Sequence, residues 1–297
     1  MSAPMPRTFV IGAGPVAVAL AGGLRLGGVP VMGLWARRGE RARAAAATAG
    51  VAAYSSAPPD LLLESHAVIL AVRDDAIAEV AETLVRTGLI TRNHVMLHCS
   101  GSMSAAQAFG NVLEQVGGVA VIHPLRAIAD GGAAMRTMAG TRFGVEGDSA
   151  GLSTVRALVG ALDGKVLALS EGQIAAYHAA AAVVSNYLVA LVDVAVELLG
   201  KADVDSEHAI DALLPLLRGT VDNLAERGLP QALTGPIRRG DSKTVERHLD
   251  AIGEGGDLAE LYQVLGRRTL ALARELGDAP EAELERISKL LRCGPAS

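Results

Sequence analysis

The chain has 297 residues, of which 50% are hydrophobic and 20% charged, as expected of a globular protein with room for two domains. A formal net charge of -5 and an aromatic content of 3% disfavour a nucleic-acid partner, which requires basic residues and exposed rings. The two cysteines, Cys99 and Cys293, form neither a metal motif nor a disulfide framework, so we expect no bound metal and a reducing, cytoplasmic location.

Residues 1–170 alternate short apolar segments with segments typical of helices. Strands are expected at residues 8–11, 28–35, 67–72, 94–98 and 119–122. Helices are expected at residues 16–26, 39–50 and 76–85. This alternation predicts βαβ units and a parallel sheet, as in a Rossmann-like dinucleotide-binding domain.

The pattern changes after residue 170, where we predict no further strand. Helices are expected at residues 174–199, 206–227, 243–254, 258–276 and 280–291, separated by breaks such as Gly228-Leu229-Pro230. The predicted fold is therefore α/β: a Rossmann-type parallel-sheet domain at residues 1–170, followed by an all-helical domain at residues 171–297. The second domain is expected to bind substrate and to dimerise.

Residues 174–199 form the longest apolar stretch, which is long enough to span a bilayer. The stretch also contains five polar or charged residues: His178, Ser185, Asn186, Asp193 and Glu197. These favour a helix buried between domains or subunits. Because the first residues also lack the apolar core of a signal peptide, we expect a soluble protein with no membrane partner.

A glycine-rich turn lies directly between the first predicted strand and the first predicted helix. In this turn Gly12 permits a tight bend, Gly14 lets the backbone approach a pyrophosphate, and Ala17 allows close packing of the helix on the strand. The N-terminus of the helix supplies an anion site. The turn therefore predicts an NAD(P) site formed by Gly12, Ala13, Gly14, Pro15 and Val16.

The end of the second strand determines the expected cofactor. NAD-binding domains normally carry an acidic residue there, but this chain has Arg37 and Arg38, and no acid precedes Glu40. A guanidinium group suits the 2′-phosphate of NADP(H), so we favour NADP(H) over NAD(H). The alternative is that both arginines only begin a solvated helix.

Two further strand ends supply candidate residues at the same edge of the sheet. The backbone at Val72 and Arg73 is expected to lie over the cofactor, whereas Asp74 and Asp75 are predicted to cap the following helix. Ser100 either hydrogen-bonds the nicotinamide or substrate, or caps the helix that begins near Met103. Nothing marks the neighbouring Cys99 as an activated nucleophile.

Polar residues on two later segments are candidates for contacts with substrate. His123 precedes a proline, so its backbone is held extended, and it either faces a substrate cleft or is a buried structural histidine. His178, Ser185 and Asn186 recur at helical spacing and form one stripe. Their roles are either catalysis or hydrogen bonding between helices.

These motifs together resemble an oxidoreductase family that joins a Rossmann-like domain to a C-terminal helical domain of unknown function. The resemblance rests on the glycine turn, residues 71–77, His123-Pro124, His178 with Ser185-Asn186, and residues 233–241. The chain is more distantly similar to ketopantoate reductase, pyrroline-5-carboxylate reductase, the 6-phosphogluconate and 3-hydroxyacid dehydrogenases, and deazaflavin-dependent NADP oxidoreductases. This resemblance implies hydride transfer in an interdomain cleft and homodimers that share the helical domain.

One position departs from the ketopantoate reductase pattern, because Ala182 occupies the place of a catalytic lysine four residues before Asn186. His178 is the nearest replacement as a proton donor or acceptor. The leading hypothesis is thus an NADP(H)-dependent reductase of a small carbonyl or imine substrate. Ser185 and Asn186 would orient the substrate, and Arg238 or Arg239 would bind a carboxylate. The alternative is a non-catalytic NADP(H)-binding redox sensor or accessory subunit.

Overall fold

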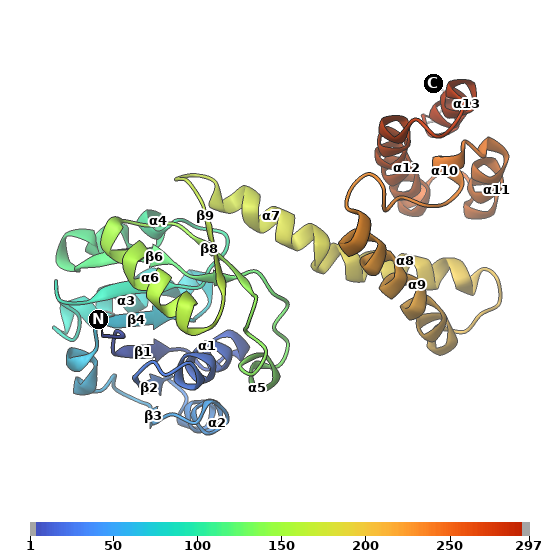
Figure 1. Ribbon diagram of the computed structural model, residues 1–297. Coiled ribbons are helices and arrows are strands. Elements are labelled where there is room, and N and C mark those ends of the chain that lie inside the picture. Colours follow the sequence, from blue (N-terminus) through green and yellow to red (C-terminus); the bar gives the residue numbers. More distant parts are fainter. Residues whose placement is uncertain (1–3, 293–297) are drawn as a thin grey trace. The chain divides into compact units, whose positions relative to one another are not determined.

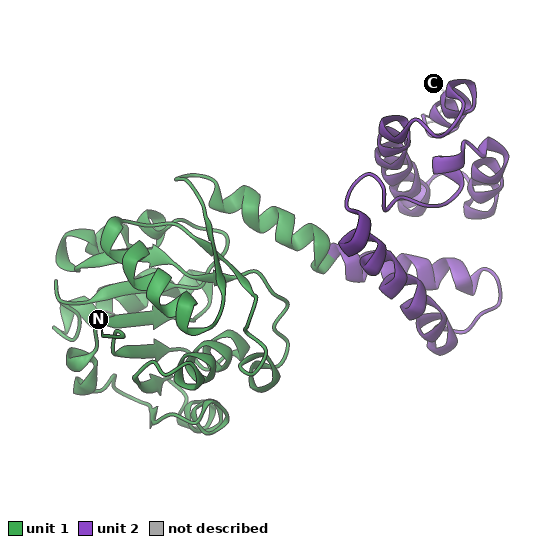
Figure 2. Ribbon diagram, in the orientation of Figure 1, with its two compact units in different colours: residues 1–186 green, residues 187–297 purple. Residues whose placement is uncertain are grey.

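The computed structural model describes residues 4–292, so Cys293 lies outside the described residues. The chain divides into two compact units, residues 1–186 and residues 187–297 (Figure 2). Each unit is described separately below.

The first unit contains a six-stranded parallel sheet with the order β3-β2-β1-β4-β5-β6 (Figure 1). The strands are β1 (Thr8–Ile11), β2 (Val31–Trp35), β3 (Ala53–Tyr54), β4 (Ala67–Leu70), β5 (Val95–His98) and β6 (Gly118–Val121). The strand order reverses between β1 and β4, which is where open α/β sheets bind ligands at their carboxyl ends. The predicted Rossmann-type domain is confirmed.

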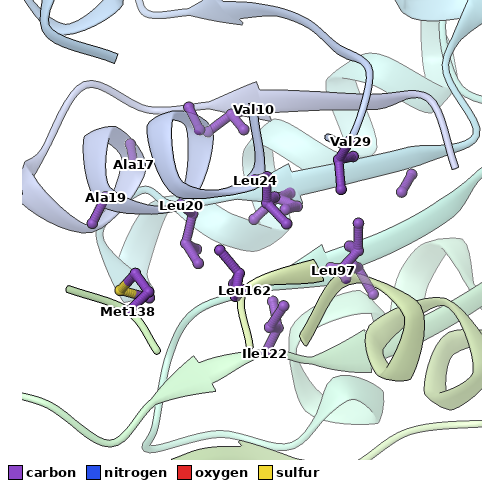
Figure 3. Close-up of a cluster of buried hydrophobic side chains, with 14 of the residues drawn as sticks. Val10, Ala17, Ala19, Leu20, Leu24, Val29, Leu97, Ile122, Met138 and Leu162 are labelled. Atoms are coloured by element: carbon purple, nitrogen blue, oxygen red, sulfur yellow. The ribbon is translucent and has the colours of Figure 1, made fainter. Parts of the chain in front are cut away.

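Helices cover the sheet (Figure 1). The side chains of each strand alternate between the two faces of the sheet. The helices are α1 (Pro15–Leu26), α2 (Gly39–Ala49), α3 (Ile77–Arg86), α4 (Ala105–Phe109) and α6 (Ser149–Ala161), with short 3₁₀ turns at Asp60–Glu64, Asp74–Ala76 and Gly110–Gln115. Val10 joins the core cluster beneath α1, with Leu20, Leu24 and Leu97 (Figure 3). Its neighbours Phe9 and Ile11 pack into the cluster on the opposite face, beneath α3. The strands β1, β4, β5 and β6 are buried along their whole length, which explains why they are almost entirely apolar.

The first unit also contains a second sheet that the sequence did not predict. It consists of β7 (His123–Pro124), β8 (Arg142–Val145) and β9 (Lys165–Ala168), with β7 antiparallel and β9 parallel to β8. The intervening helix α5 spans Gly131–Ala134. The two-residue strand β7 and the exposed edge strand β9 show no hydrophobic periodicity, so the local sequence pattern does not predict them.

The expected helix at residues 174–199 is divided into α7 (Ile174–Val184) and α8 (Asn186–Gly200), with Ser185 between them. By length and composition, Ile174–Gly200 could cross a membrane, and none of its most apolar window is buried within the chain. Within the described residues, Ile174 is the one buried residue of α7, and α8 has none.

The second unit continues with α9 (Ser206–Arg227), α10 (Pro236–Arg239), α11 (Ser242–Ile252), α12 (Gly256–Leu276) and α13 (Glu281–Leu290). Helices are the only regular elements found among residues 187–292, as predicted. Its hydrophobic core joins α10 to α13 through residues such as Val245, Leu270 and Ile287.

Candidate active site

A cavity of about 780 Å³ lies at the carboxyl ends of β1, β2 and β4, where the strand order reverses. All ten residues that the sequence predicts to bind the cofactor line this one cavity: Gly12, Ala13, Gly14, Pro15, Val16, Arg37, Arg38, Val72, Arg73 and Ser100. Parallel strands end at one edge of a sheet, and this brings residues from four separate segments together.

The glycine turn fits a dinucleotide. The backbone of Gly12 has φ +130°, and a Cβ atom there would lie 2.1 Å from the carbonyl oxygen of Ala71. Gly14 is the N-cap residue of α1, has open space where a Cβ would point, and leaves the first helical turn without a side-chain cap. The unsatisfied N–H groups of that turn suit the oxygens of a pyrophosphate.

Three arginines surround the end of β2. Arg37, Arg38 and Arg41 line the cavity and are exposed, and within residues 4–292 no hydrogen bond or ion pair occupies their guanidinium groups. By contrast, Arg73 forms a bidentate pair with Asp75, with nitrogen–oxygen distances of 2.6 and 3.1 Å. Sequence reasoning missed Arg41, although its place in the first turn of the second helix was a usable signal.

Asp74 does not cap a helix, contrary to the sequence prediction. Its Oδ2 accepts hydrogen bonds from the hydroxyls of Ser100 and Ser102, each at 2.7 Å, and α3 has no side-chain cap. Asp75 is paired with Arg73 instead of capping. Nor does Ser100 cap the next helix, because Ser104 does so in a capping box with Gln107. The aspartate thus fixes the segment after β5 against the segment after β4.

Burial raises the pKa of the Cys99 thiol to about 12. This agrees with the expectation that Cys99 is not an activated nucleophile.

Two histidines converge on Gly101, the residue between Ser100 and Ser102. A Cβ at Gly101 would lie 2.5 Å from Nδ1 of His178 and 2.8 Å from Nε2 of His123. The two imidazoles cross edge to face, with ring centroids 5.6 Å apart. Nδ1 of His178 is buried and has no hydrogen-bond partner among the described residues. Ser100 lines the cavity and Gly101 contacts the histidines, so one short segment connects the two features.

Burial determines the charge of His123 and of the neighbouring His98. Burial lowers the pKa of His123 to about 4, assisted by the charge of His178 and opposed by that of Asp74. Burial also lowers the pKa of His98 to about 4, and its Nδ1 accepts the N–H of Ser100 at 3.2 Å. Both imidazoles are therefore neutral at pH 7.

Ser185 and Asn186 are not brought to His178 by any hydrogen bond or ring contact between described residues. The backbone N–H of Ser185 donates to Ala181, and Asn186 is exposed at the start of α8. Because the helix is interrupted at Ser185, the single polar stripe expected from helical spacing is not continuous.

The two arginines predicted to bind a carboxylate differ in their surroundings. Arg238 forms an ion pair with Asp278 at 2.7 Å and donates to the carbonyl oxygen of Leu233 at 2.6 Å. Its donors are therefore used to hold the loop before α10 against the end of α12. Arg239 is exposed and has no hydrogen bond or ion pair with residues 4–292.

Comparisons with known families match the two halves of the chain separately. Residues 7–109 match a family described as NADP oxidoreductase, coenzyme F420-dependent, and residues 141–269 match a domain of unknown function, DUF2520. Among curated proteins no match was found.

Solved structures share the fold over most of the chain. A Thermotoga maritima protein is 24% identical, covers 90% of this chain and 99% of its own, and has a TM-score of 0.70. A Bacteroides fragilis protein assigned as an NADP oxidoreductase is also 24% identical, covers 89% of this chain and 98% of its own, and has a TM-score of 0.68. A Plasmodium falciparum pyrroline carboxylate reductase with NADP bound is 13% identical, covers 96% of this chain and 98% of its own, and has a TM-score of 0.56.

Proposed function

Since the chain is an NAD(P)-dependent oxidoreductase, we propose that it is an NADP(H)-dependent reductase of a small carbonyl or imine compound. The observation that carries this proposal is the segment after β5, where Ser100 lines the cofactor cavity and Gly101 contacts His123 and His178. When bound, the nicotinamide supplies hydride. The residues of the chain bind the dinucleotide, position the substrate and transfer the proton.

The cavity supports NADP(H) over NAD(H). The N-terminus of α1 and the open face at Gly14 would hold the pyrophosphate. Arg37, Arg38 and Arg41 would bind a 2′-phosphate, because their guanidinium groups are exposed at the end of β2 where an acidic residue would otherwise bind ribose hydroxyls.

Replacing Arg37 with alanine should weaken NADPH binding by roughly tenfold to a hundredfold, the effect of losing one charged hydrogen bond of about 1.5–3 kcal/mol. NADH lacks the 2′-phosphate, so its affinity should change by less than about threefold. Titration calorimetry with both cofactors would measure this. Arg43→Ala is the matched control, because Arg43 is an exposed arginine on α2, the helix that follows Arg37, and does not line the cavity. Equal weakening of NADPH and NADH would contradict the preference for NADP(H).

His178 is proposed to donate the proton that accompanies hydride transfer, since no lysine occupies the position of Ala182. His123 would contact the substrate, and Ser185 and Asn186 would orient it. Arg239 is a better candidate than Arg238 for binding a substrate carboxylate, because the guanidinium group of Arg238 already forms an ion pair with Asp278. The substrate class thus includes small keto acids, as for ketopantoate reductase.

The second candidate function is a non-catalytic NADP(H)-binding redox sensor or accessory subunit, and Ala182 in place of a lysine favours it. Screening small keto acids and cyclic imines for NADPH oxidation would separate the two functions. A chain that binds NADPH tightly but oxidises it with none of these compounds would support the sensor.

Self-association through the helical region is part of the proposal. The helix α8 buries none of its residues, and α9 buries only Ala209. Val189 and Leu216 expose 71% and 68% of their surface. Asp193 and Glu197 make a membrane an expensive environment for α8, at about 2.5–3.5 kcal/mol per central charge for an acidic residue. A second copy of the chain is the partner that would bury these helices in a cytoplasmic protein.

We therefore expect a molecular mass in solution of about twice the 30.4 kDa of the chain. Val189→Lys should shift the protein toward the monomer, because a lysine placed at an apolar interface loses its hydration. Analytical ultracentrifugation at several concentrations would measure the change, with Lys243→Ala on α11 as a control. A wild-type protein that is monomeric at all concentrations would contradict the proposed homodimer.

A further inference from the structure

A tyrosine that follows the first helical turn of α7 contacts His123 from the side opposite Gly101. The ring of Tyr177 crosses the imidazole edge to face, with centroids 5.5 Å apart and an interplanar angle of 89°. Its hydroxyl lies 2.9 Å from Nδ1 of His123. Sequence reasoning singled out His178 and passed over the adjacent Tyr177.

The second sheet provides the space for this contact. His123 of β7 is paired with Gly144 of β8, and a Cβ at Gly144 would lie only 2.5 Å from Cζ of Tyr177. The absence of a side chain at Gly144 therefore leaves room for the phenol beside β8. Burial raises the pKa of Tyr177, so the phenol keeps its proton at neutral pH.

The distances indicate where that proton points. The hydroxyl oxygen lies 2.9 Å from Nδ1 of His123 but 3.4 Å from the carbonyl oxygen of the same residue. A hydroxyl donor prefers the shorter contact, and a neutral imidazole nitrogen is an acceptor only when it carries no proton. The shorter contact favours Nδ1 of His123 as the acceptor of the hydroxyl proton, an arrangement that leaves the imidazole proton on Nε2.

We propose that Tyr177 is a positioning residue, which holds His123 as the Nε2–H tautomer and directs that N–H toward the space beside Gly101 and His178. This inference rests on the proposed reductase function and narrows its substrate class. A neutral imidazole that presents N–H can bind a carbonyl oxygen, which is an acceptor. It offers no acceptor to the N–H of a protonated imine.

The substrate class assigned in this way is a ketone or aldehyde. Its oxygen accepts a hydrogen bond from Nε2–H of His123, which polarises the carbonyl as hydride reaches the carbon. The same oxygen then takes a proton from His178, and His123 retains its own proton. The carbonyl is reduced to an alcohol while NADPH is oxidised to NADP⁺.

The tautomer can be measured without any activity. Nitrogen NMR of the ¹⁵N-histidine-labelled full chain distinguishes a protonated from an unprotonated ring nitrogen, and His123→Gln identifies the resonances. We expect protonated Nε2 and unprotonated Nδ1 at pH 7. Tyr177→Phe, which keeps the ring, should produce a mixture of both tautomers. A wild-type His123 with its proton on Nδ1 would overturn the proposal.

The chain supplies a matched control for the phenol. Tyr262 makes the same kind of contact with His248, at 2.8 Å between the hydroxyl and Nδ1 and 6.0 Å between centroids, in the second unit. Tyr262→Phe should leave the His123 resonances unchanged. A change equal to that of Tyr177→Phe would show that the effect is not specific to Tyr177.

The kinetic measurement uses whichever compound oxidises NADPH in the keto acid and imine screen. Tyr177→Phe should lower kcat for a ketone by about tenfold, equivalent to about 1.4 kcal/mol, and leave the KM for NADPH unchanged. Reduction of cyclic imines but of no ketone would overturn the assigned substrate class while the reductase function stands. Absence of NADPH oxidation with every compound would overturn the reductase function, and the NMR result would be unaffected.

Discussion

Replacing Gly12 with alanine should abolish NADPH binding and lower the free energy of unfolding by about 3 kcal/mol or more. The added methyl group would lie 2.1 Å from the carbonyl oxygen of Ala71, and the backbone at Gly12 has φ +130°, which disfavours any side chain. Ala71 is tied to the sheet by its N–H, which donates to Ile11 at 2.8 Å. The clash therefore cannot be relieved without moving the end of β4. Urea unfolding and calorimetric titration with NADPH would measure both effects.

Gly14→Ala separates ligand binding from folding at the same turn. Gly14 has φ -82°, and no atom lies within 4 Å of the position of its Cβ, so the methyl group fits the unliganded protein. Stability should change by less than about 1 kcal/mol. NADPH affinity should fall by roughly tenfold or more, because the methyl group occupies the side from which a pyrophosphate approaches. Full NADPH affinity in this variant would mean that the dinucleotide does not contact the turn.

Replacing His178 with alanine should lower turnover by roughly 10²- to 10⁴-fold, the usual contribution of a general acid or base. NADPH affinity should be nearly unchanged, because His178 does not line the dinucleotide cavity. The fold should also tolerate the change, since Nδ1 of His178 has no hydrogen-bond partner among the described residues. Steady-state kinetics with the substrate from the screen, together with calorimetric titration of NADPH, would test this.

His208→Ala is a suitable control for the loss of a histidine. His208 lies in the second unit, on α9, and its ring pairs with Asp205 at 2.6 Å on the exposed surface. Turnover in this variant should stay within about twofold of the wild-type protein. If His178→Ala also retained wild-type turnover, His178 would have no part in proton transfer.

The sequence alone determined the dinucleotide half of the protein. Buried parallel strands such as residues 67–70 are apolar without interruption, and Gly12 and Gly14 follow the first strand directly. Both signals are local, because they depend on neighbours within a few residues. The ten predicted cofactor residues share one cavity since parallel strands place their carboxyl ends at one edge. The change from alternating strands and helices to helices alone is also readable from periodicity.

Hydrogen bonds between segments that are distant in the sequence could not be predicted from such local signals. The sequence predicted that Asp74 caps a helix, but its carboxylate instead receives the hydroxyls of Ser100 and Ser102. Arg238 was expected to bind substrate, but it pairs with Asp278, 40 residues away. An aspartate or arginine is compatible with several partners, and only the folded chain selects among them.

The tertiary structure alone decided the arrangement around Gly101. His123, Tyr177 and His178 come from β7 and α7, and the short second sheet that positions His123 and Gly144 has no periodic signal in the sequence. Hydrophobic periodicity specifies which face of an element is buried, but not which element lies across from it. The cofactor half depends on local order along the chain and was predictable. The histidine pair and its tyrosine depend on contacts between distant segments, and only the fold reveals them.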